Sequence, residues 1–137
     1  MHASAFQDAI AVIVQRDPRF EPDAYLFLKE ALDFTVKRSK ENSEDDANRH
    51  VSGPELLKGF RDCALEQFGP MASTLLREWG IEECRHVGEM VFSLIGEQVF
   101  GKQDSDTLDD FTNIYQFKEA FEDSFLPGSQ LKASETN

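Results

Sequence analysis

The chain has 137 residues, of which 40% are hydrophobic and twelve are phenylalanine, so it carries enough apolar side chains for a folded core. Its 26 acidic and 14 basic residues give a formal charge of −12, which opposes binding to nucleic acid or to an anionic membrane. No stretch approaches the roughly 20 apolar residues that a membrane-spanning helix needs. We therefore expect a cytoplasmic protein with a single domain over residues 1–128 and a disordered tail over 129–137.

Helical periodicity runs through residues 3–40. Apolar residues recur at steps of three and four between residues 3 and 16, which predicts a helix that Pro18 ends. A second helix is predicted from Pro22 to Lys40, because this segment opens with proline and an acidic residue and closes with basic residues. The segment 41–48 reads ENSEDDAN and has no apolar anchor, so we expect an exposed acidic loop there.

Three further helices are predicted between residues 52 and 95. The sequence Ser52-Gly53-Pro54-Glu55 has the pattern of a capping box, and the helix that it begins should end at Gly69. A short helix over 70–79 and a longer one over 83–95 follow, joined by a tight link. Helices therefore dominate this part of the chain as well.

Two glycines fall in the middle of these helices. Gly59 and Gly88 lie on the predicted helical segments, where glycine costs up to ~1 kcal/mol relative to alanine. A close approach of a neighbouring helix to the bare backbone would compensate this cost. We interpret both glycines as packing positions in preference to functional ones.

The pattern changes after Gly96. Val99-Phe100 and the segment 111–117 are rich in aromatic and β-branched residues, which predicts a small β-hairpin within 97–117. A last short helix is expected over 118–125, ended by proline and glycine.

The order of elements from residue 52 onward is that of a winged helix. The segments 70–79 and 83–95 would be its helix-turn-helix pair, and 99–117 would be its wing. We therefore predict a mainly α (α+β) fold with five or six helices and one small β-hairpin. Its C-terminal half, residues 52–125, is expected to be winged-helix-like.

Charge argues against DNA recognition by this half. A DNA-reading winged helix needs basic residues on its second helix and wing, but residues 81–117 hold eight acidic residues against only Arg85 and Lys102. Residues 81–137 contribute −8 of the total charge of −12. A protein partner, preferably a basic one, is therefore the expected ligand, with no role for nucleic acid.

No metal, cofactor or catalytic site can be recognised from residue spacing. A calcium-binding loop starting at Asp104 would require glycine where the chain has Asp109 and glutamate where it has Tyr115. The histidines and cysteines are scattered, without the paired spacing of a zinc site. No serine-histidine-aspartate arrangement or phosphate-binding glycine loop is present either.

The two cysteines are too few to staple a domain of this size. We expect Cys63 to be buried on the face that carries Phe60 and Ala64 and not to be bonded to Cys84. Reduced thiols agree with a cytoplasmic location.

Four residues are candidates for contact with a partner. Phe20 lies between two prolines and Phe27 points away from the Leu28 face, so each is either buried by the second half of the domain, which we favour, or an exposed contact anchor. Arg85 is one of the two basic residues of the segment 81–117. His86, at a helix start, is a surface or capping residue.

Several motifs together resemble an uncharacterised family of short conserved hypothetical proteins from planctomycete and verrucomicrobial bacteria. The resemblance covers nearly all of residues 5–125, and the motifs include Arg16-Asp17-Pro18-Arg19-Phe20, His50-Val51-Ser52-Gly53-Pro54, Gln67-Phe68-Gly69-Pro70 and Trp79-Gly80-Ile81. The chain departs from the family at Glu83-Cys84, where a threonine or serine cap would be expected. The resemblance implies a single soluble bacterial domain and carries no activity, ligand or catalytic residue.

Two classes of function remain open from the sequence. The favoured one is a non-enzymatic protein–protein interaction module. The alternative is a small enzyme or ligand-binding domain with a site between the N-terminal helices, 3–40, and the winged-helix-like part. A concave pocket with convergent polar groups would distinguish the two, and the oligomeric state stays open.

Overall fold

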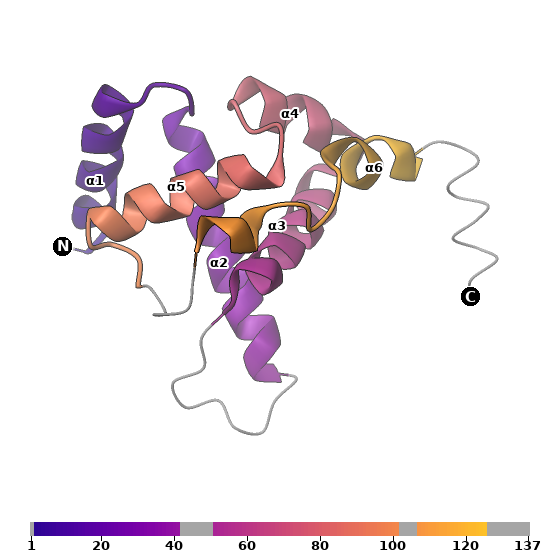
Figure 1. Ribbon diagram of the computed structural model, residues 1–137, viewed down its shortest axis with the longest axis horizontal. Helices are drawn as coiled ribbons and strands as arrows, with labels where there is room; N and C mark the ends of the chain where they lie inside the picture. Colours follow the sequence, from indigo (N-terminus) through magenta and orange to yellow (C-terminus); the bar gives the residue numbers. More distant parts are fainter. Residues whose placement is uncertain (1, 42–50, 102–106, 126–137) are drawn as a thin grey trace.

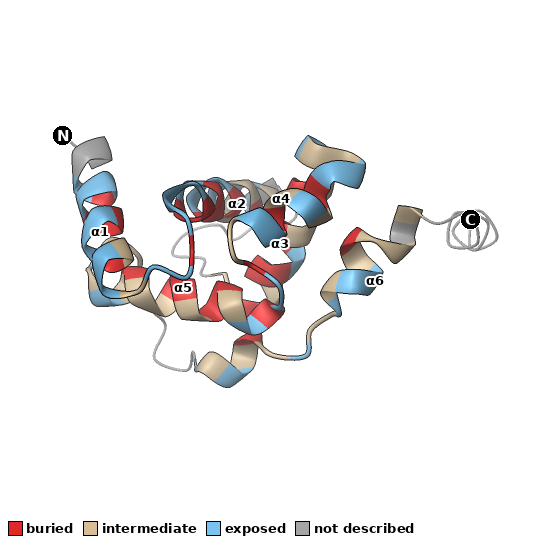
Figure 2. Cartoon of the chain, turned by 90° about the horizontal axis from the view of Figure 1, so that it is seen from above, coloured by how far each residue is buried: buried red, intermediate tan, exposed pale blue. Residues whose placement is uncertain are grey.

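The computed structural model describes residues 2–41, 51–101 and 107–125 (Figure 1). Within these ranges the chain forms six α-helices: α1 (His2–Arg16), α2 (Pro22–Glu41), α3 (Gly53–Phe68), α4 (Ala72–Glu78), α5 (Cys84–Gly96) and α6 (Phe117–Phe121). Three short 3-10 helices accompany them: η1 (Gly69–Met71), η2 (Leu108–Phe111) and η3 (Asp123–Phe125). Helices α1 and α6 lie at opposite ends of the molecule in both Figure 1 and Figure 2.

The predicted β-hairpin is wrong, and with it the α+β class and the winged-helix-like half. None of the described residues belongs to a strand. The backbone amides of Val99 and Phe100 donate to the carbonyl oxygen of Leu94 at 3.1 and 3.4 Å, so they complete the end of α5 instead of pairing with a second strand. The other predicted strand begins inside η2, which a capping box between Thr107 and Asp110 holds in place. Part of the predicted wing, 102–106, lies outside the described residues.

The helices predicted up to residue 95 are confirmed, with small shifts at their ends. The hydroxyl of Ser52 accepts a hydrogen bond from the Glu55 amide at 3.2 Å, and the Glu55 carboxylate accepts one from the Ser52 amide at 3.0 Å. Gly69 ends α3 with φ at +54°. The predicted last helix splits into α6 and η3. The predicted acidic loop beyond residue 41 and the predicted tail lie outside the described residues.

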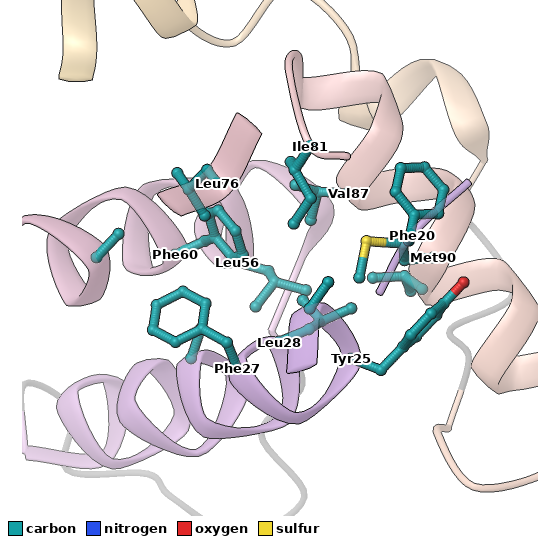
Figure 3. Close-up of a cluster of buried hydrophobic side chains, with 14 of the residues drawn as sticks. Phe20, Tyr25, Phe27, Leu28, Leu56, Phe60, Leu76, Ile81, Val87 and Met90 are labelled. Atoms are coloured by element: carbon teal, nitrogen blue, oxygen red, sulfur yellow. The ribbon is translucent and has the colours of Figure 1, made fainter. Parts of the chain in front are cut away.

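One cluster of buried side chains draws on all six α-helices. Its central part joins α2 to α3, α4 and α5 (Figure 3). Helices α2 and α3 approach closely at Gly59, where an added Cβ would lie 1.7 Å from the hydroxyl oxygen of Thr35. The interpretation of Gly59 as a packing position is therefore confirmed.

A second close approach joins α5 to η2 at Gly88. A Cβ at this position would lie 2.5 Å from the Cβ of Phe111, which is 3% exposed. The neighbour of Gly88 is thus a 3-10 helix and not an α-helix, but its role in packing is as predicted. After Phe111 the chain continues to the N-terminal end of α5, where the thiol of Cys84 donates to the carbonyl oxygen of Tyr115.

The link between α1 and α2 is held by the link between α4 and α5. The amide of Glu21 donates to the carbonyl oxygen of Trp79 at 3.1 Å. Gly80 adopts a φ of +96°, and a Cβ there would lie 2.2 Å from the carbonyl oxygen of Arg19. Only glycine fits both the backbone conformation and the space at this position. The hydrogen bond and this close approach hold the two links against each other.

Candidate binding groove

Two hollows lie where α4, α6 and the N-terminal end of α5 meet. The first has a volume of about 170 Å³ and lies between α4 and α6, with Ser73, Arg77 and Glu122 among its lining residues. The second, about 450 Å³, is bounded by residues 82–85, 112–113 and 115–118. Glu82, Phe117 and Lys118 line both hollows, which therefore adjoin each other. We call the two hollows together the α4–α6 groove.

Aromatic side chains form the floor of the α4–α6 groove. The ring of Phe117 lies 4.9 Å from that of Phe121 in an edge-to-face arrangement and stacks on Tyr115 at 5.8 Å. Phe121 is 1% exposed, whereas Phe117 is only half-buried. Phe117 is thus the ring that a ligand in the groove can reach, and its neighbours fix its position.

The segment that carries this floor is fastened to the core. The hydroxyl of Tyr115 donates to the carbonyl oxygen of Leu57 at 2.8 Å, and the thiol of Cys84 donates to the carbonyl oxygen of Tyr115 at 3.3 Å. Burial raises the pKa of the Tyr115 phenol well above its ordinary value, so the hydroxyl keeps the proton that it donates. The groove is therefore largely pre-formed.

Two basic side chains on the rim are paired with carboxylates beside them. Arg77 lies 2.9 Å from the Glu122 carboxylate, which also accepts a hydrogen bond from the Ser73 hydroxyl at 2.7 Å. The Nζ of Lys118 donates a hydrogen bond of 2.8 Å to the Asp123 carboxylate, and this bond raises the pKa of the lysine. Each of these two cations therefore has a carboxylate partner on the rim.

A third basic residue, Arg85, belongs to an ion network that joins α5 to the α1–α2 link. Its guanidinium lies 3.1 Å from Glu89, which in turn lies 2.8 Å from Arg19, and Arg19 pairs with Asp17 at 2.8 Å. Burial alone would raise the pKa of the Glu89 carboxyl, but the hydrogen bonds from Arg85 and Arg19 outweigh it, and the pKa is lowered. The hydrogen bond from Arg19 likewise lowers the pKa of Asp17.

Glu82 and Glu83 supply the acidic side of the groove. The backbone amide of Glu82 donates to Nδ1 of His86 at 3.0 Å, and Nε2 of His86 lies 3.8 Å from the Glu83 carboxylate. Both glutamates are exposed. Within the described ranges, no residue forms an ion pair with the Glu82 carboxylate.

The four candidate contact residues divide into two pairs. Phe20 and Phe27 are 2% and 4% exposed, so the favoured interpretation of burial is confirmed and neither is a surface anchor. Arg85 lines the larger hollow. His86 lines neither hollow. Its Nδ1 accepts a hydrogen bond from the Glu82 amide, and its ring lies edge-to-face with that of Phe20, with 5.5 Å between the ring centroids.

The sequence does not mark Phe117 as a functional candidate, because this residue lies at the end of a predicted strand. In the structure Phe117 opens α6. Glu82 stands out in the sequence only as one of the acidic residues of the segment 81–117. The signal that the sequence offers is an aromatic residue followed by a basic one, Phe117-Lys118, at the start of the predicted last helix.

The cysteines agree with their predicted state. Both thiols are free and buried, and Cys63 lies on α3 with Phe60 and Ala64. Burial raises the pKa of Cys84, although this residue lines the larger hollow. The thiol is therefore protonated near neutral pH and is a poor nucleophile.

The predicted alternative location for a site, between the N-terminal helices and residues 52–125, holds a hollow of about 50 Å³. Leu32, Leu56 and Phe111 are typical of its lining, which contains no charged side chain. Convergent polar groups occur at the α4–α6 groove instead, within the C-terminal half. Among the described residues, no three His, Cys, Asp or Glu side chains are grouped as metal ligands would be, and no helix has the length and apolar character to cross a membrane.

The chain matches no protein-family model, and no curated protein or solved structure shows significant similarity to it. The resemblance to the planctomycete and verrucomicrobial family stays a prediction from the motifs that carry it. Arguments about function therefore depend on the geometry of the α4–α6 groove.

Proposed function

We propose that this protein is a protein-binding module that receives a segment of a partner protein in the α4–α6 groove. Phe117 carries the proposal, because it lines both hollows and is only half-buried. An accessible aromatic ring surrounded by polar and charged groups is the usual arrangement at the centre of a protein–protein interface.

The shape and chemistry of the groove favour an extended ligand. Its two hollows meet at Phe117 and offer about 170 and 450 Å³. Backbone and side chains of a peptide can fill both at once, with apolar groups on the aromatic floor and polar groups at the rim. A pre-formed floor lowers the entropic cost of such binding.

The charge of the chain favours a basic partner. A formal charge of −12 attracts cationic protein surfaces and repels nucleic acid and anionic lipid. We propose the cytoplasm as the site of action, because two buried, unbonded thiols suit a reducing compartment.

A ligand-binding domain for a small molecule is the second candidate. The larger hollow falls in the size range of small-molecule sites, which is about 300–1,000 Å³. Its lining includes several polar groups, among them Thr112, Asn113 and Gln116. Its thiol is protonated and its cations are paired, so binding is better supported than a chemical reaction.

Photo-cross-linking in cells that produce the protein distinguishes these candidates. We place benzoylphenylalanine at Phe117 and, as a control, at Val12, which is 47% exposed on α1 at the opposite end of the molecule. The proposal predicts a discrete protein adduct at position 117 and none of that mass at position 12. Equal adducts at both positions would contradict it. A small molecule co-purifying with unlinked protein would support the second candidate instead.

A further inference from the structure

We propose that the partner segment places a lysine or arginine at Glu82 and an adjacent apolar side chain on Phe117. This inference rests on the proposed function and adds the chemistry of the ligand. Three observations support it. The Glu82 carboxylate has no ion-pair partner among the described residues, the ring of Phe117 is accessible, and both residues line both hollows.

Acidic and basic residues both line the α4–α6 groove, but the charged groups there that lack a close ion-pair partner are carboxylates. Arg77, Lys118 and Arg85 are each engaged by a carboxylate, at 2.9, 2.8 and 3.1 Å respectively. Glu82 has no such partner within the described ranges, and Glu83 has only the distant imidazole of His86 at 3.8 Å. A ligand in the larger hollow therefore meets the carboxylates of Glu82 and Glu83, and Glu82 also lines the smaller hollow.

The position of Glu82 is set by the fold. Its amide is held by His86 at 3.0 Å, and the residue before it, Ile81, is 1% exposed and forms part of the core. Ile81 also lines the smaller hollow together with Phe117. Glu82 thus stands at a fixed point beside the aromatic floor, and only its side chain is free to adjust.

A long basic side chain matches this arrangement better than other ligand groups. Its methylene stem can cover the face of Phe117 while the charged end reaches the carboxylate of Glu82. An acidic side chain or a phosphate at the same point would be repelled by Glu82 and Glu83. The apolar neighbour in the partner then occupies the remainder of the aromatic floor.

Three short capped peptides test the inference in solution, with a central Arg-Leu, Gly-Leu or Glu-Leu pair. They are titrated into the full ¹⁵N-labelled chain, and affinity is read from the amide shifts of residues 81–83 and 117–118. The variants are Glu82→Gln and, as a matched control, Glu78→Gln, which removes the same charge from an exposed site on α4 outside both hollows. Thermal unfolding checks that both variants fold as the wild type does.

The Arg-Leu peptide is expected to shift the groove amides and to bind more tightly than the other two. Glu82→Gln should weaken it about two- to fivefold, the range for an exposed ion pair, and Glu78→Gln should leave it unchanged. Equal weakening by both variants, or tighter binding of the Glu-Leu peptide, would overturn the partner chemistry while the groove kept its proposed function. Failure of all three peptides to shift the groove amides would count against both proposals.

Discussion

The hydroxyl of Tyr115 donates a hydrogen bond of 2.8 Å to the backbone carbonyl oxygen of Leu57, across 58 positions of sequence. This bond ties the segment before α6 to the first half of α3. It holds Tyr115 under Phe117, whose ring stacks on it at 5.8 Å. Tyr115 therefore connects the α4–α6 groove to α3.

Replacing Tyr115 with phenylalanine should destabilise the protein by about 1 kcal/mol, because it removes one hydrogen bond and keeps the ring. Leu57 lies inside α3, so its carbonyl oxygen retains a helical environment. Urea unfolding of wild type and variant measures the loss. An unchanged midpoint would show that the bond does not hold the segment in place.

Replacing Gly59 with alanine should cost about 1–3 kcal/mol, the usual range for overpacking, because the new Cβ overlaps Thr35. Combining it with Thr35→Ala should recover part of the loss, which a double-mutant cycle from urea unfolding would reveal. Gly96→Ala is the matched control, since nothing lies within 4 Å of a Cβ at that helical position. It should be neutral or stabilising by up to ~1 kcal/mol. Equal effects of the two glycine substitutions would contradict the close crossing of α2 and α3.

Acid should weaken the protein through the network of Asp17, Arg19, Arg85 and Glu89. The pKa values of Asp17 and Glu89 are lowered in the folded state, so their contribution is fully present above their unfolded values. It is lost as the pH falls below about 4 and through the folded values. Urea unfolding between pH 7 and 3 should show this decline, and Glu89→Gln should show a smaller one. An identical pH dependence of the variant would show that Glu89 does not contribute to the loss of stability in acid.

The two thiols should react slowly with a thiol reagent in the folded protein and completely after denaturation without reductant. Both are buried, and burial raises the pKa of each. Raising the pH should accelerate the reaction of the folded protein only well above neutrality. Recovery of fewer than two thiols from the denatured chain would indicate a disulfide and contradict the proposed cytoplasmic location.

Local signals in the sequence predicted most of the helices. Apolar periodicity located α1, α2 and α5, and the capping box at Ser52 located the start of α3. These features depend on residues within a few positions of one another. Such signals can therefore be recognised without knowledge of the tertiary contacts.

The prediction of strands after α5 was wrong because long-range contacts determine the structure of this region. The segment 111–117 has the composition of a strand, but Phe111 packs on Gly88 and Tyr115 bonds to Leu57. Val99, the expected start of the other strand, closes α5. The groove could not be predicted from the sequence for the same reason. Its lining comes from α4, α6 and the start of α5, and no local sequence pattern shows that these elements lie together.

The affinity of the cross-linked partner for purified variants tests the central claim most directly. We would measure the Kd calorimetrically for wild type, for Phe117→Ala and for Val12→Ala, after confirming by thermal unfolding that each variant is folded. A protein-binding groove centred on Phe117 predicts a Kd about tenfold or more higher for Phe117→Ala and an unchanged Kd for Val12→Ala. An unchanged Kd for a folded Phe117→Ala variant would contradict the assignment of the α4–α6 groove as the binding site.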